Sequence, residues 1–182
     1  MKKLLAILAL AIGTTAMAAE KIELGYRQDR ERGTAATSDN ILIGYKSDIG
    51  SNLGWSLDAN LAERGRDQRL TNRYSVGLDY NYGLGYVSGK LGQKNVSLQS
   101  ATNFYQVEAG VKYAVSPVLT AKVGYVYRDA FNDRVDDLQK GVKLGMDYAL
   151  TKNLSLGAKY DLVEDSRGVK TDRFGVSVSK RF

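Results

Sequence analysis

The chain has 182 residues, a formal net charge of +6, no cysteine and no histidine. Without cysteine it has neither a disulfide framework nor a thiol that could carry a lipid. Without histidine it lacks the usual base of acid–base and triad catalysis, so we expect no enzymatic activity and no cofactor. The charge is too small to indicate nucleic acid as a partner.

The N-terminus has the pattern of a secretory signal peptide. Two lysines follow Met1, residues 4–12 carry no charge, and the segment ends in Ala16-Met17-Ala18. This pattern predicts a signal peptide over residues 1–18 and a mature domain over residues 19–182. The apolar run is too short for a membrane-spanning helix, and no later segment approaches the ~20 apolar residues that such a helix needs.

Ten segments of the mature chain alternate apolar and polar residues with the period of a β-strand. They cover residues 21–28, 40–47, 53–63, 73–82, 86–93, 104–114, 118–128, 138–149, 154–162 and 173–182. The connections between them alternate between long and short, as in outer-membrane barrels, where long loops face outward and short turns face the periplasm. We therefore predict an all-β, antiparallel up-and-down transmembrane barrel of ten strands, with eight or twelve as alternatives. The last segment, ending on Phe182, is expected to pair with the first.

Aromatic residues gather near the predicted strand ends, although ordinary β-propensity is an alternative explanation. The distribution favours two girdles at the membrane boundaries. At the short-turn end we expect Tyr45, Trp55, Tyr80, Tyr82, Tyr86, Tyr113, Tyr148 and Phe182. At the long-loop end we expect Tyr26, Tyr74, Tyr105, Tyr125, Tyr127, Tyr160 and Phe174. A repeat of about 33 residues, marked by Gly44, Gly77, Gly110 and Gly145, suggests one hairpin per repeat.

Residues out of phase with the apolar set are predicted to line the lumen. The basic ones are Arg27, Lys46, Arg73, Lys90, Lys112, Lys122, Arg128, Lys143, Lys159 and Arg181. The acidic ones are Glu23, Asp58, Asp79, Glu108, Asp147 and Asp161. A soluble barrel would instead turn its apolar face inward and place these charges in water. Lys140 and Lys180 fall in the outward phase near strand ends, where a lysine can extend to the headgroups.

Two functions fit such a lumen. In the first, charges of both signs pair and fill the narrow lumen. The protein would then be a structural barrel, or an adhesin that acts through its long loops. Alternatively, the basic excess could line a water-filled pore that favours small anions. We expect a monomer in the bacterial outer membrane, with lipid, lipopolysaccharide and small solutes as partners. The barrel-assembly machinery is expected to bind the C-terminal strand that ends in Phe182.

Two predicted loops contain clusters of charged residues, which could bind a ligand or simply be hydrated by solvent. Asp133, Asp136 and Asp137 could bind calcium loosely, but such a cluster is more often a solvated loop, so we expect no metal site. Arg64, Arg66 and Arg69 could contact lipopolysaccharide or simply keep their loop hydrated. We favour the solvated interpretation for both clusters.

The whole mature chain resembles small Gram-negative outer-membrane β-barrel proteins. It is also similar to the oligogalacturonate-specific porin family in three places, namely Tyr26-Arg27, residues 39–43 and the segment from Arg173-Phe174 to Phe182. This resemblance implies a lumen lined by arginine and lysine that passes acidic oligosaccharides, with Arg27 at such a position. Members of that family have twelve strands and this chain has ten predicted ones. The resemblance therefore implies a porin-like protein and leaves the substrate open.

Overall fold

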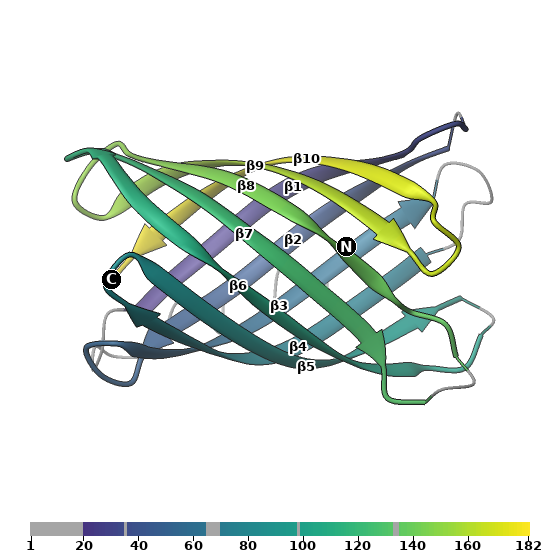
Figure 1. Ribbon diagram of the computed structural model, residues 1–182. Coiled ribbons are helices and arrows are strands. Elements are labelled where there is room, and N and C mark those ends of the chain that lie inside the picture. Colours follow the sequence, from purple (N-terminus) through teal and green to yellow (C-terminus); the bar gives the residue numbers. More distant parts are fainter. Residues whose placement is uncertain (1–19, 35, 65–69, 98, 133–134) are drawn as a thin grey trace, which may run out of the picture.

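The computed structural model describes residues 20–34, 36–64, 70–97, 99–132 and 135–182. Ten antiparallel strands form a closed barrel in which each strand pairs with its neighbours in sequence (Figure 1). The strands are β1 (Glu20–Glu31), β2 (Thr37–Asp48), β3 (Leu53–Arg64), β4 (Leu70–Tyr82), β5 (Gly85–Val96), β6 (Thr102–Ser116), β7 (Leu119–Ala130), β8 (Gln139–Ala149), β9 (Leu154–Asp165) and β10 (Lys170–Arg181). The predicted ten-stranded barrel is confirmed.

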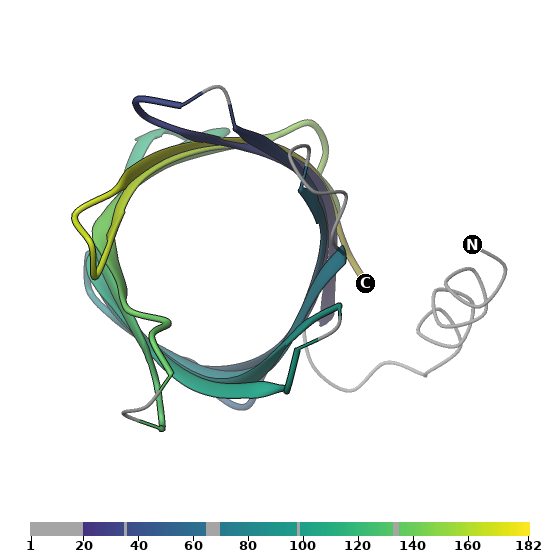
Figure 2. The same ribbon diagram turned by 90° about the vertical axis from the view of Figure 1, so that its right-hand side faces the viewer.

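The barrel closes where its last strand meets its first, as Figure 2 shows in a view along the axis. Strands β10 and β1 pair from Lys21 opposite Arg181 to Glu31 opposite Thr171. The backbone N–H of Phe182 donates to the carbonyl of Glu20 at 3.0 Å, so the ladder continues to the last residue. Because closure pairs every strand on both sides, the sheet has no free edge.

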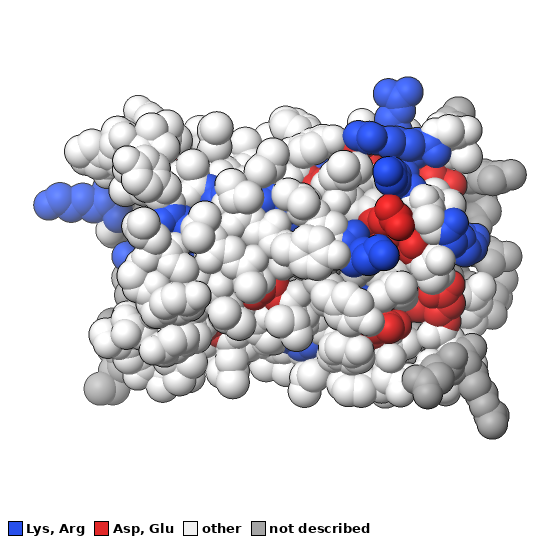
Figure 3. All heavy atoms as spheres, in the orientation of Figure 1, with Lys and Arg blue, Asp and Glu red and all other residues white. Residues whose placement is uncertain are grey.

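The apolar residues point away from the barrel axis. Leu57, Val76, Val123 and Leu144 are 46%, 51%, 48% and 45% exposed, whereas the inward-facing Arg128 and Asp161 are 5% and 8% exposed. The visible wall in Figure 3 is mostly uncharged, with most blue and red atoms at the long-loop end and a smaller blue group at the short-turn end. This is the polarity expected of a barrel whose outer surface contacts lipid. The described part of the chain has no helix with the length and hydropathy needed to cross a bilayer.

Most strands extend further toward the long-loop end than predicted. The connections at that end are residues 32–36, 65–69, 97–101, 131–138 and 166–169, which makes them shorter than the sequence pattern indicated. The extra strand residues are mostly polar on both faces, and backbone pairing holds them without regular apolar alternation. The predicted signal peptide, Arg66, Arg69 and Asp133 lie outside the described residues.

One aromatic residue assigned to the short-turn girdle lies inside the barrel. Tyr86 lines the internal cavity, and its hydroxyl donates to Glu108 at 2.8 Å. Its ring covers two glycines of neighbouring strands, since a Cβ on Gly110 would lie 2.8 Å from Cε1 of Tyr86, and one on Gly124 would meet the Tyr86 hydroxyl. The girdle assignment of Tyr86 was therefore wrong. The ring needs the space that the missing side chains leave, which gives the repeat glycine at position 110 a packing role.

Candidate functional site

The lumen holds a cavity of about 500 Å³ whose lining is predominantly charged. All sixteen charged residues that the sequence places inside line this cavity, and Lys21, Asp48 and Arg173 line it with them. Its lining thus includes twelve lysine or arginine residues and seven aspartate or glutamate residues. The lysines and arginines lie at different positions along the barrel axis. Most lysines lie in the middle and toward the short-turn end, while four arginines lie toward the long-loop end.

Most lysines of the lumen are paired with a carboxylate on another strand. Lys159 lies 2.5 Å from Glu23, Lys90 lies 2.5 Å from Asp58, and Lys143 lies 2.7 Å from Glu108. Lys122 contacts Asp147, and Lys46 lies 3.7 Å from Asp79. Four of these pairs join strands that are two apart around the barrel, and Lys122 with Asp147 joins the neighbouring strands β7 and β8. The pairs therefore connect the strands of the wall as well as neutralise charge.

Lys112 differs from the other lysines of this group because its ammonium is bound by neutral groups. It donates to the side-chain oxygen of Asn81 and lies 5.0 Å from the centre of the Tyr86 ring. An amide oxygen and an aromatic face both stabilise a cation without cancelling its charge. Lys112 therefore contributes a net positive charge to the cavity.

The side chains of four arginines form a layer across the lumen toward the long-loop end, which we call the arginine layer. They are Arg27, Arg73, Arg128 and Arg173. Asp29 lies between two of them, 2.6 Å from Nε of Arg27 and 3.4 Å from Nε of Arg173. The amide of Asn40, which is almost fully buried, accepts a further hydrogen bond from Arg27 at 3.1 Å. Such charge-assisted contacts fix the guanidinium planes in the lumen wall.

Arg73 has no carboxylate partner among the residues that the structure describes. Its Nε is buried without a hydrogen-bond partner, although the side chain lines the cavity. A guanidinium is always charged, so without a carboxylate beside it Arg73 adds a net positive charge to this end of the lumen.

Asp137 reaches the arginine layer from the connection between β7 and β8. Its side chain is almost fully buried and lies 2.6 Å from Nζ of Lys94 and 3.0 Å from Nε of Arg128. Burial alone would raise the pKa of this carboxyl, but the nearby charges of Arg128 and Lys94 outweigh it and hold the pKa below its ordinary value. The prediction that Asp137 belongs to a solvated loop is wrong, because the loop turns this residue into the lumen mouth. Within the described chain, no three acidic, histidine or cysteine side chains are grouped to hold a metal.

Sequence reasoning missed six charged residues of the site, namely Lys21, Asp29, Asp48, Lys94, Asp137 and Arg173. Lys21 and Arg173 were placed at strand ends, and Asp29, Asp48 and Lys94 in connections, but each continues the inward phase of its strand. Extending the two-residue period past the last apolar residue would have found these five. Asp137 lies outside any strand, so periodicity carries no signal for it.

Comparison with known proteins gives one family match. The family model described as outer membrane protein beta-barrel domain matches residues 4–182. A search of curated protein sequences gave no significant match. Among solved structures, the translocator domain of the autotransporter NalP from Neisseria meningitidis aligns with a TM-score of 0.55 at 10% identity, covering 100% of this chain and 94% of that chain. At this identity the likeness shows the barrel fold alone.

Two porin structures also align with the chain. The NanC porin aligns with a TM-score of 0.48 at 10% identity, covering 90% of this chain and 100% of that chain. The KdgM porin in complex with disordered oligogalacturonate aligns with a TM-score of 0.48 at 12% identity, covering 89% and 99%.

Proposed function

Because the chain belongs to the family of outer membrane protein β-barrel domains, and is thus a protein of the bacterial outer membrane, we propose that it forms a passive channel for small, preferably anionic solutes. The observation that carries this proposal is the excess of cations in the lumen lining, twelve against seven. The acidic side chains are largely matched to individual lysines or arginines, whereas Arg73 and Lys112 have no carboxylate partner in the part of the chain that the structure describes.

The physical basis is the field of these unmatched cations inside a wall of low dielectric constant. Lipid surrounds the barrel, so field lines concentrate along the lumen and raise the local concentration of anions. Lys112 toward the short-turn end and Arg73 toward the long-loop end provide two successive attractive positions. A path with several moderate positions lets an ion enter and leave, whereas one deep position would trap it.

The proposal is tested by recording purified protein in planar lipid bilayers across a salt gradient. We expect measurable conductance with a reversal potential of the sign for anion preference. The substitutions Arg73→Gln and Lys112→Gln should each move this potential toward zero. Lys152→Gln, in the exposed turn between β8 and β9, serves as the control for a lost positive charge outside the lumen and should leave the potential nearly unchanged.

A second candidate, a plugged structural barrel, is favoured by the ion pairs that brace the lumen, such as Lys159 with Glu23 and Lys90 with Asp58. Silent bilayers containing correctly folded protein would support this candidate and contradict the channel. A conductance that both lumen substitutions leave unchanged would show that Arg73 and Lys112 do not line the permeation path. The short connections at the long-loop end leave less surface for an adhesin than the sequence pattern suggested.

A further inference from the structure

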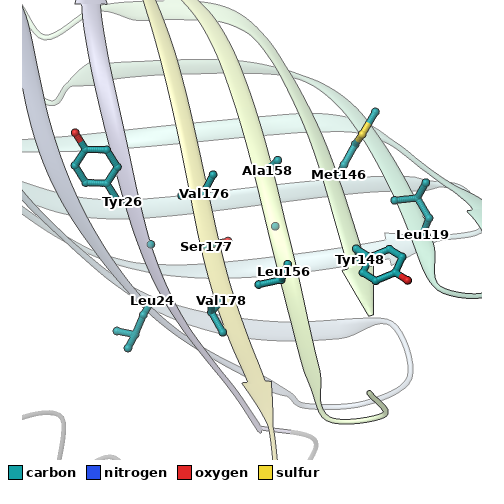
Figure 4. A pocket seen from close by; sticks show the side chains of 12 residues that line it. Leu24, Tyr26, Leu119, Met146, Tyr148, Leu156, Ala158, Val176, Ser177 and Val178 are labelled. Atoms are coloured by element: carbon teal, nitrogen blue, oxygen red, sulfur yellow. The ribbon is translucent and has the colours of Figure 1, made fainter. Parts of the chain in front are cut away.

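The outer wall of the barrel is hollowed over β1, β7, β8, β9 and β10 by a groove of about 710 Å³ (Figure 4). Two cross-strand rows of outward side chains form it. The row nearer the short-turn end consists of Leu119, Tyr148, Leu156, Val178 and Leu24. The next row consists of Met146, Ala158, Val176 and Tyr26.

The hollow arises from the small side chains in the middle of the second row. Figure 4 shows the single methyl group of Ala158 between Met146 and Val176. The next row toward the long-loop end contains Tyr160 opposite Phe174, so two aromatic rings bound the hollow on that side. The groove is therefore closed toward the long-loop end and runs toward the short-turn end, which is the periplasmic side.

A cation lies one cross-strand row beyond the groove, toward the short-turn end. Lys180 faces outward on β10, two residues beyond Val178, and pairs in register with Leu154 and Ile22. Its ammonium lies 4.9 Å from the centre of the Phe182 ring, and within the described chain it forms no ion pair. Lys152 lies in the adjoining turn between β8 and β9.

From these observations we infer that the wall formed by β1 and β8–β10 binds an anionic phospholipid of the periplasmic leaflet. The phosphate contacts Lys180 at the membrane boundary, and one acyl chain lies in the groove as far as Ala158 and Val176. The step of four residues from Lys180 to Val176 spans about 13 Å along the strand, which is about 10 Å of depth for a strand tilted by about 40°. This depth lies within one leaflet, which is half of the ~30 Å hydrocarbon core. A lysine near a membrane surface also favours anionic over neutral headgroups.

The test is native mass spectrometry of the intact protein in non-ionic detergent, titrated separately with phosphatidylglycerol and with phosphatidylcholine. We expect phosphatidylglycerol to be retained with about fivefold higher apparent affinity, the factor that one lysine near the surface provides. Lys180→Gln should abolish this preference. Ala158→Phe fills the groove and should reduce retention of both lipids.

Two matched variants serve as controls. Lys140→Gln removes an outward lysine at the opposite end of the wall, and Ala109→Phe enlarges an outward alanine on β6, outside the groove. Neither should change lipid retention, and far-UV circular dichroism checks that every variant is folded. Equal retention of both lipids by the wild type, or equal effects of the groove and control substitutions, would overturn the inference. A dimer that Ala158→Phe dissociates would assign the groove to a second copy of the chain and overturn it as well.

Discussion

Asp137 is the residue whose substitution should change the lumen most directly. It is a negative charge held between Lys94 and Arg128, the two cations that it partly neutralises. Asp137→Asn keeps the shape of the side chain and removes this charge. We expect anion preference in bilayer recordings to rise about fivefold, as ~1 kcal/mol of additional attraction gives. Asp136→Asn, on the exposed neighbouring residue, should have little effect.

The pH dependence of this carboxyl follows from its lowered pKa. A carboxyl whose pKa is depressed in the folded state keeps its ion pairs above the ordinary value of about 3.9 and loses them as pH falls through the depressed value. The contact of Asp137 should therefore persist at pH 4 and be lost in more acidic solution. The difference between wild type and Asp137→Asn should vanish there, whereas a difference that persists at the lowest pH would contradict this account.

The glycines of the repeat should differ in their tolerance of a methyl group. At Gly110 an added Cβ would meet the Tyr86 ring and the backbone of β7, whereas at Gly145 its nearest neighbour is 3.7 Å away. Gly110→Ala should lower the free energy of unfolding by about 1–3 kcal/mol, the usual cost of overpacking. Gly145→Ala should change it by less than about 0.5 kcal/mol. Urea titration of folded protein in detergent micelles or vesicles would measure both, and equal effects would exclude the packing role of Tyr86.

At the scale of strands, the barrel closure is reinforced by an ion pair that spans three strands. Lys159 of β9 reaches Glu23 of β1 across β10, which lies between them. Glu23→Gln leaves the ammonium without its main partner, and we expect a loss of about 1–2 kcal/mol in unfolding free energy because the pair is only partly buried. Glu164→Gln breaks the more exposed outer pair with Lys140 and should cost less than ~0.5 kcal/mol. A smaller effect at Glu23 than at Glu164 would contradict a role in closure.

The strands themselves could be predicted wherever lipid contacts one face. There, burial in hydrocarbon requires an apolar residue at every second position, so the pattern of Leu57 or Leu144 and its neighbours is clear in the sequence. Beyond the membrane both faces are polar and only backbone pairing holds the strand, so Asp29 and Lys94 looked like loop residues. The inward position of Tyr86 depends on two glycines in other strands, and the position of Asp137 depends on the course of a loop. Neither relation is local in sequence, so the alternation of residues along a strand could not predict it.

At the scale of the whole molecule, the barrel separates two media. Its outer wall has an apolar band that matches lipid, while its interior carries both signs of charge with a basic excess. The two surfaces are one residue apart along every strand, so a shift of register by one residue would exchange them. Continuous pairing from β1 through β10 prevents this exchange and keeps the charged side chains inside.

This separation predicts that a charge on the outer wall is tolerated according to its depth. Leu144 lies near the middle of β8, and Leu154 lies at the short-turn end of β9. Leu144→Arg should reduce stability in phospholipid vesicles by about 2–4 kcal/mol, and Leu154→Arg by about 0–1 kcal/mol, since an arginine near the interface reaches the headgroups. Urea titrations in vesicles should show this difference, and in detergent micelles, where the apolar layer is thinner and more adaptable, it should shrink. Equal costs at the two positions in vesicles would mean that Leu144 does not face the centre of the bilayer.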